Sequence, residues 1–421
     1  MHRLNDIKYR ILATGNTEGK REILDRLKKL WMDTFEDSKA YVELVYDTSL
    51  GESIIVVCES KGGDLISSLL ALPYTFRDSS GAIQTTGWYL CGLATVEEYR
   101  GRGIMGTMMS MAEKEILKAG GGFAFLIPAD SRLELYYHRK GYLKGAHRTK
   151  IRIPKISIED CSAARSFNNR RRSMDVPNAY QLYRIKWSEM EAEQQEGLIS
   201  FLVHQERIEA NAKTSEVLSL EHTRSDFETI LRENEISGGE VLLLRKTGHN
   251  SPDKNSEYPN FATVALTFPQ SDENGKRTIE IRKISGEIAD TLELLFLISI
   301  DNRIDLYVDP WREKLIEAIK DNFSSKGGYD DTTSELESVS EQYIMVKDIL
   351  GEPEEDTDKK TENSQESPES EISIFLSSHA KNLKYPIFRK AGESVSKRQF
   401  EESGEIVALD SAKITADLLL D

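Results

Sequence analysis

The sequence is poor in cysteine and in long apolar runs. It has only three cysteines among 421 residues, and the spacing of Cys58, Cys91 and Cys161 fits neither a metal motif nor a disulfide framework. So few thiols are typical of a reducing compartment, and we expect a cytoplasmic protein without a bound metal. No apolar run approaches the roughly 20 residues of a spanning helix, and residues 1–15 lack the apolar core of a signal peptide.

Basic charge is also scarce. The formal net charge is −16, from 55 lysines and arginines against 71 aspartates and glutamates, which argues against general binding of nucleic acid. Much of the acid lies in residues 352–372, which are rich in serine and low in apolar residues, so we expect a disordered acidic insert there. A chain of this length exceeds one typical core and predicts two or three domains.

The first third of the chain has the periodicity of a mixed α/β fold. Apolar residues recur at helical spacing over residues 18–36. Apolar runs at 53–60, 65–76 and 87–96 are separated by turn residues and predict an antiparallel meander. A helix from residue 104 and a buried strand at 123–127 then predict a parallel strand pair joined by a crossover helix.

The most informative segment is the turn between the strand at 87–96 and the helix that follows. It holds Arg100, Gly101, Arg102 and Gly103. Glycine lets the backbone bend and approach a ligand closely. The helix start offers unpaired N–H groups and a partial positive charge, and two arginines stand beside it. These features predict a site for a pyrophosphate.

Residues 89–142 resemble the Gcn5-related N-acetyltransferase superfamily. The matching segments are the strand LCGLATV, the turn YRGRGIMG, the strand FAFLI and the closing motif LYYHRKGY. The resemblance implies that acetyl-CoA is bound as co-substrate and that its acetyl group passes to an amine by direct attack in a ternary complex. Met105 stands where the family pattern has a small residue. A larger residue there is seen in the enhanced intracellular survival type of bacterial acetyltransferase, the branch we favour.

The resemblance also implies which residues hold the coenzyme. An extended strand edge at Leu93, Ala94 and Thr95 would bond to the pantetheine arm as another strand would. Arg100 and Arg102 would contact phosphates or be solvated surface side chains. Arg132 would reach the coenzyme or stay at the surface. The pyrophosphate would lie among the backbone N–H groups of Gly101, Arg102, Gly103, Ile104, Met105 and Gly106.

The general acid implied by the resemblance is Tyr137, which lies four residues before the pair Gly141-Tyr142. A phenol near the sulfur would stabilise the departing thiolate by donating a hydrogen bond. The competing interpretation is an aromatic residue that fills the core. We expect Tyr136 to take that core position.

The general base is less clear from the sequence. In the enhanced intracellular survival branch the C-terminal carboxylate enters the active site, which here implies Asp421. The competing interpretation is a frayed chain end. Glu97 and Glu98, just after the ligand-binding strand, are alternatives, although a solvated acidic pair also explains them.

The resemblance gives an overall organisation of α/β class. We expect a catalytic domain over 1–155, a degenerate second acetyltransferase-like domain over 175–330 and a small α+β sterol-carrier-like domain over 335–421. Both larger domains would have mixed sheets. The second domain shows no phosphate turn and would help to shape the acceptor pocket, unless it is an unrelated α/β domain.

The expected acceptor is an amine on a small molecule or a peptide. A homo-oligomer is possible in this branch, and neither nucleic acid nor a membrane span is expected. The alternative function is a non-catalytic acyl-CoA-binding or interaction protein that keeps the same fold. Coenzyme binding is common to both interpretations, so turnover separates them.

Overall fold

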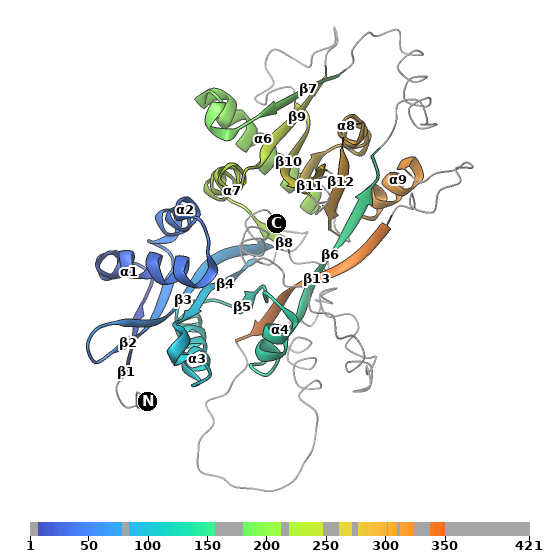
Figure 1. Ribbon diagram of the computed structural model, residues 1–421. Coiled ribbons are helices and arrows are strands. Elements are labelled where there is room, and N and C mark those ends of the chain that lie inside the picture. The colour runs from blue at the N-terminus through green and yellow to red at the C-terminus, as the bar shows by residue number, and fades with distance from the viewer. Residues whose placement is uncertain are drawn as a thin grey trace, which may run out of the picture. The chain divides into compact units, whose positions relative to one another are not determined.

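The computed structural model describes residues 7–77, 84–155, 180–211, 219–246, 261–271, 277–300, 302–309, 312–323 and 337–349. These residues divide into two compact units (Figure 1). The first unit takes the described residues among 1–146, 210–221 and 343–415, and the second those among 147–209 and 222–342. Asp421 and the acidic segment 352–372 lie outside the described residues.

The first unit is an α/β layer with an antiparallel meander, as predicted. Strands β1 to β4 pair in sequence order, and β5 lies parallel to β4. The predicted helices at 18–36 and from residue 104 are also present. The elements are β1 (Ile7–Leu12), α1 (Thr17–Phe35), α2 (Lys39–Ser49), β2 (Ile54–Ser60), β3 (Leu65–Arg77), β4 (Gln84–Thr95), the 3-10 helix η2 (Glu97–Tyr99), α3 (Ile104–Lys118), β5 (Phe123–Leu126) and α4 (Ser131–His138).

Helix α3 packs its apolar face on the sheet of the first unit. Met108, Ala112 and Ile116 are fully buried in one core with side chains of β2, β3 and β5. Each fully buried apolar side chain of this size contributes about 1.5–3 kcal/mol. This packing fixes the N-terminal end of α3 against the end of β4, which matters for the site described below.

A β-bulge bends β4 near its end. The register passes from the pair Leu70 and Cys91 to the pair Ser68 and Ala94, so β4 holds one extra residue there. Gly92 has a φ of +57°, and a Cβ atom on it would lie 2.5 Å from the Trp31 ring of α1. Only glycine meets both conditions. The close approach of α1 and the bend of β4 therefore depend on this one residue.

The second unit repeats the element order of the first. It runs strand, two helices, three antiparallel strands, helix, parallel strand, helix. The elements are β7 (Tyr180–Ile185), the 3-10 helix η3 (Trp187–Glu189), α6 (Ala192–Asn211), α7 (Arg224–Ile236), β9 (Glu240–Lys246), β10 (Phe261–Ser271), β11 (Arg277–Gly286), α8 (Ile288–Ser299), β12 (Arg303–Val308) and α9 (Glu313–Phe323).

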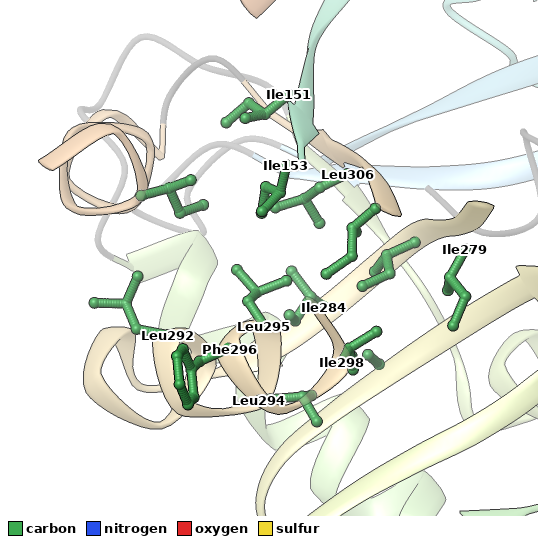
Figure 2. Close-up of a cluster of buried hydrophobic side chains, with 14 of the residues drawn as sticks. Ile151, Ile153, Ile279, Ile284, Leu292, Leu294, Leu295, Phe296, Ile298 and Leu306 are labelled. Atoms are coloured by element: carbon green, nitrogen blue, oxygen red, sulfur yellow. The ribbon is translucent and has the colours of Figure 1, made fainter. Parts of the chain in front are cut away.

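Helix α8 lies at the centre of the second unit's core. Leu294, Leu295 and Ile298 are fully buried, and Figure 2 shows them among Ile151, Leu306 and other aliphatic side chains. A helix that is apolar on most of its circumference is typical of a fully enclosed position. The second unit therefore has a core of its own.

Two strands, β6 and β13, pair with strands that are far from them in the sequence. Strand β6 (Leu143–Ile153) follows α4 in sequence, yet its residues 149–153 pair with β12. Strand β13 (Glu337–Asp348) follows α9, yet its residues 345–348 pair with β5. A short strand, β8 (Ser219–Glu221), pairs with β3. The predicted sterol-carrier-like domain over 335–421 stays a prediction, because its residues beyond 349 lie outside the described part of the chain.

No helix in the described part of the chain has the length and apolarity needed to cross a membrane. In the same ranges, no three histidine, cysteine, aspartate or glutamate side chains gather as a metal site would require. Cys58 and Cys91 are buried free thiols.

Candidate active site

The candidate site begins where two parallel strands part. Strand β5 pairs with β4 only from Gly87 to Tyr89, whereas β4 continues to Thr95. The edge of β4 that faces away from β3 is therefore not bonded by β5 over Leu90–Thr95. Ala94 is buried, while Leu93 and Thr95 are half-buried. An extended molecule that offers amide groups fits such an edge as an added strand would.

The predicted turn follows directly and has the backbone shape that its glycines allow. Gly101 and Gly103 have φ angles of +73° and +80°, in the left-handed region that favours glycine. A Cβ atom on either would meet nothing within 4 Å. Packing therefore does not explain these two glycines. They serve the backbone conformation and leave open space above the turn.

The start of α3 points its N–H groups at this open space. Gly103 is the N-cap and supplies no side-chain cap, and the Thr107 amide donates to the Gly103 carbonyl at 3.1 Å. The amides of Ile104 to Gly106 lie ahead of that bond, in the first turn, where helices leave N–H groups for other acceptors. Such amides, together with the helix dipole, are the groups that anion sites at helix starts use.

The two arginines of the turn bond to its backbone. Arg100 Nε donates to the Thr95 carbonyl at 2.9 Å, and Arg102 Nη2 donates to the Glu98 carbonyl at 2.5 Å. The Arg102 guanidinium also lies 5.0 Å from the centre of the Tyr99 ring. Both side chains hold the shape of the turn and place positive charge at its rim.

Sequence reasoning missed Lys140 and Tyr136 as members of this site. A Cβ atom on Gly106 would lie 2.5 Å from Lys140 Nζ and 3.6 Å from the Tyr136 hydroxyl. Both groups therefore lie against the first turn of α3. Lys140 lies just after the C-cap of α4, and the closeness of this segment to Gly106 is a tertiary contact that local spacing does not encode.

Met105, the departure from the family pattern, is accommodated by the core. Its side chain is half-buried and packs against the apolar cluster beneath α3. Its backbone amide stays in the first turn of the helix.

The structure reverses the expected burial of the two tyrosines of α4. We expected Tyr136 in the core, but Tyr137 is the buried residue, with 7% of its surface exposed, and Tyr136 is half-buried. Burial raises the pKa of Tyr137 well above its usual value, with smaller contributions from Tyr136 and Asp130. Tyr137 therefore stays protonated at neutral pH and keeps a hydrogen to donate. Its role as general acid stays a prediction.

The closing motif is tied to α3 and β13 by polar contacts. The Tyr142 hydroxyl donates to Glu113 Oε1 at 3.0 Å, and Lys347 Nζ donates to Glu113 Oε2 at 2.8 Å. Tyr142 is fully buried. Gly141, with φ of +87°, makes the turn between α4 and Tyr142. This network fixes the end of α4, and with it Tyr137 and Lys140.

The remaining predicted residues lie at the surface or outside the described ranges. Arg132 has 80% of its side chain exposed and pairs with Asp130 at 3.4 Å. Glu97 and Glu98 are exposed on η2, directly after β4. Asp421 lies outside the described residues. The structure thus brings together the strand edge, the turn, Lys140 and the two tyrosines of α4.

Comparison with known proteins agrees with this geometry. Residues 18–144 match the family model described as acetyltransferase (GNAT) domain. A GCN5-related N-acetyltransferase from Anabaena variabilis ATCC 29413 has a TM-score of 0.54 at 12% identity, covering 81% of this chain and 73% of that one. Comparison with curated protein sequences gives no match.

Two further solved structures have similar folds. A GCN5-related N-acetyltransferase from Kribbella flavida has a TM-score of 0.50 at 15% identity, covering 82% of this chain and 72% of that one. Eis1 from Mycobacterium abscessus has a TM-score of 0.50 at 13% identity, covering 82% and 73%. The similarity at these identities is one of fold. Residues 18–144 of this chain thus match the model of a GNAT acetyltransferase domain, and the chain shares the fold of GCN5-related N-acetyltransferases.

Proposed function

We propose that the first unit is an acetyl-CoA-dependent N-acetyltransferase. The observation that supports it most is that an unbonded strand edge runs directly into a turn built on two left-handed glycines at the end of β4. The buried Tyr137 belongs to the same core cluster as Ile104, at the start of the helix that follows. A GNAT family match over the same residues supports acyl transfer from an acyl-CoA.

The coenzyme would be held by groups that are already in position. The diphosphate would accept hydrogen bonds from the amides of 101–106, and Lys140 would add a positive charge beside Gly106. The pantetheine arm would bond along Leu93, Ala94 and Thr95. Arg100 and Arg102 would stabilise the shape of the turn and place positive charge at its edge. The residues present therefore have the chemistry that a diphosphate and an amide-bearing arm require.

The reaction we propose is direct attack of an amine on the thioester carbonyl carbon. A carbon–nitrogen bond forms, the carbon–sulfur bond breaks, and sulfur leaves as a thiolate, whose free pKa is about 8.5. The Tyr137 hydroxyl would donate a hydrogen bond to that sulfur. Because burial raises the pKa of Tyr137, we expect it to stabilise the thiolate mainly as a donor.

The attacking amine must first lose a proton. We propose that a carboxylate takes it, either that of Asp421 or another acid through a water molecule, with Glu97 and Glu98 as the nearest alternatives in sequence. Removal of the last few residues tests the terminal role. Unchanged turnover after that truncation rules Asp421 out as the base and leaves the rest of the proposal in place.

The experiment that tests the function is an assay for free thiol over a panel of polyamines, aminoglycosides and lysine peptides. Calorimetry of acetyl-CoA binding accompanies it. Acceptor-dependent thiol release supports the enzyme. Measurable acetyl-CoA binding without release for any acceptor favours the non-catalytic acyl-CoA-binding protein. Absence of acetyl-CoA binding at saturating concentration contradicts both.

A further inference from the structure

A second pair of parallel strands parts in the second unit. Strand β12 pairs with β11 only up to Ile281 and Leu306, whereas β11 continues to Gly286. A β-bulge lies just beyond that point, because the register with β10 passes from Ile281 to Lys283 and leaves Arg282 as the extra residue. Bulges redirect side chains. The second unit thus repeats the parting and the bulge seen in β4.

This second parting does not have a phosphate turn. Only Glu287 separates β11 from α8, and its carboxylate disfavours an anion at that helix start. Gly286 also differs from Gly101 and Gly103, since a Cβ atom on it would lie 2.5 Å from Thr263 Oγ1. The second unit therefore lacks the open space that a coenzyme diphosphate would need.

Charged side chains nevertheless surround a cavity at this place. Residues 282–284 of β11 and residues 307–309 at the end of β12 line this cavity, where the two strands separate. Four cationic and two acidic side chains contribute to the lining, namely Arg148, Arg282, Lys283, Arg312, Glu209 and Asp309. Arg148 and Arg282 are only 5% and 6% exposed. A buried concentration of positive charge of this kind is costly unless anionic groups face it.

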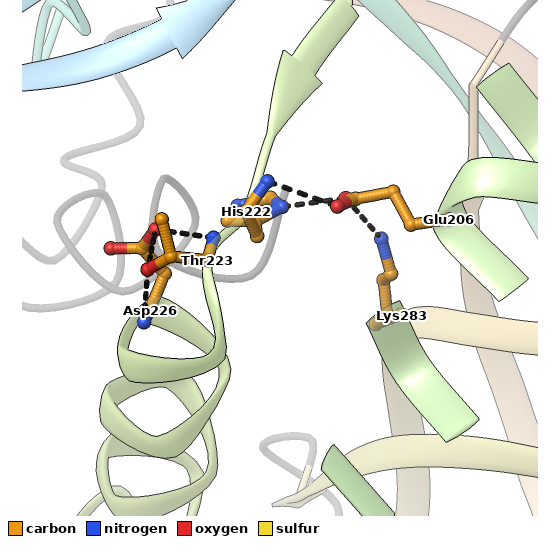
Figure 3. A network of polar contacts seen from close by, with 5 residues as sticks. All are labelled: Glu206, His222, Thr223, Asp226 and Lys283. Atoms are coloured by element: carbon orange, nitrogen blue, oxygen red, sulfur yellow. Dashed lines mark hydrogen bonds and ion pairs between the residues drawn. The ribbon is translucent and has the colours of Figure 1, made fainter. Parts of the chain in front are cut away.

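Protein carboxylates face three of these cations. Glu280 accepts a hydrogen bond from Arg282 Nε at 2.6 Å. Glu206 lies 3.7 Å from Lys283 Nζ and 2.6 Å from His222 Nδ1 (Figure 3). Glu209 lies 3.6 Å from Arg312 Nη2. The contacts of 3.6 and 3.7 Å are ion pairs beyond hydrogen-bond length.

An aromatic ring and a backbone carbonyl hold two of the arginines beside the cavity. The Arg148 guanidinium lies 3.9 Å from the centre of the Tyr307 ring, and Arg312 Nη1 donates to the Ile284 carbonyl at 2.7 Å. Glu209 Oε1 is buried, and no donor in the described part of the chain hydrogen-bonds to it. A buried carboxylate oxygen of this kind calls for a donor from a molecule in the cavity.

We propose that this cavity binds a small oxyanion that also carries a hydrogen-bond donor. Its negative charge would lie among Arg148, Lys283 and Arg312, and its hydroxyl would donate to Glu209 Oε1. Planar guanidinium groups suit both carboxylate and phosphate oxygens. The shared chemistry is thus that of a protonated phosphate or a small hydroxycarboxylate. The site is independent of the proposed transferase activity.

The test is calorimetry on the full chain without coenzyme, at constant ionic strength, with inorganic phosphate and with lactate as probes. Acetate, which lacks the hydroxyl, tests the donor. We expect saturable binding of phosphate or lactate, with weaker binding of acetate. Arg312→Gln is expected to weaken binding about tenfold or more. The tighter binder of the two shows whether the cavity prefers a phosphate or a hydroxycarboxylate.

Two control variants assign the binding to this cavity. Arg184→Gln removes a cation of the second unit that is 42% exposed and distant from the lining set, and it should leave binding unchanged. Lys140→Gln reports on phosphate held at the first unit's turn, so any phosphate binding that this variant weakens belongs to that turn and not to the cavity. Circular dichroism checks folding, and Lys283→Gln replaces Arg312→Gln if that variant does not fold.

The outcomes divide cleanly. Binding that is lost in the cavity variants and kept in both controls supports the site. Absence of saturable binding for every probe overturns it. Equal binding by wild type and a folded Arg312→Gln or Lys283→Gln variant also overturns it. None of these results depends on whether the first unit transfers acetyl groups.

Discussion

Replacing Gly103 by alanine tests the phosphate turn with little change in packing. Gly103 has a φ of +80°, and a Cβ atom there would meet nothing within 4 Å. The substitution therefore adds backbone strain and no collision. An L-residue in the left-handed region costs about 1–2 kcal/mol. We expect Gly103→Ala to lower the free energy of unfolding by about that amount.

The same strain predicts the loss of coenzyme affinity. If the turn instead relaxes to an unstrained shape in the variant, stability stays near that of the wild type, and the same cost appears on binding, which must restore the left-handed conformation. Affinity for acetyl-CoA then falls by about 5- to 30-fold, since 1.4 kcal/mol corresponds to a factor of ten. Urea unfolding measures the stability, and calorimetry measures the affinity.

Gly51→Ala is the matched control for this substitution. Gly51 lies in the same unit, also has open space around its Cβ position, and has no positive φ. We expect a change in unfolding free energy within about 0.5 kcal/mol and unaltered coenzyme affinity. If Gly103→Ala keeps both the stability and the coenzyme affinity of the wild type, the turn does not depend on a residue in the left-handed conformation and the reasoning is refuted.

Three further predictions concern single side chains. Tyr137→Phe should lower turnover by about 10²-fold or more with little change in coenzyme affinity; equal losses of both would point to a structural role. Lys140→Gln should weaken acetyl-CoA binding a few-fold and make that binding less dependent on salt. Turnover at saturating acetyl-CoA should stay unchanged. Calorimetry at two salt concentrations measures both the affinity and its salt dependence. Burial raises the pKa of Glu206, but His222 and Lys283 outweigh burial and lower that pKa to about 2. Its ionised form therefore stabilises the fold above about pH 4.3, and this contribution is lost as the pH falls towards 2. Glu206→Gln should cost about 3 kcal/mol at pH 7 and flatten the loss of stability between pH 5 and 3; an unchanged acid profile would contradict this.

Local patterns in the sequence predicted most of the first unit and the position of the turn. The meander, the crossover to β5 and the glycine-rich helix start depend on neighbouring residues, and these are confirmed. Helix α2 was missed. Its segment is rich in valine and tyrosine, which favour strands, although Gly51 directly after the C-cap Leu50 was a signal for its end. The signal for its start was Ser38, whose hydroxyl caps the helix by accepting from the Tyr41 amide.

Contacts between distant residues could not be predicted in this way. Leu126 pairs with Met345, more than 200 positions later in the chain, and no local periodicity encodes that choice. The exchange of burial between Tyr136 and Tyr137 has the same origin. Helical spacing shows that the two side chains point in different directions, but which direction faces α3 is set by tertiary packing. Lys140 was missed for the same reason.

The most direct test of the account is a crystal structure of the protein with acetyl-CoA bound. We predict diphosphate oxygens within hydrogen-bond distance of the amides of 101–106, with the sulfur beside the Tyr137 hydroxyl. Coenzyme bound elsewhere, or absent from the turn at saturating concentration, would contradict the proposed function.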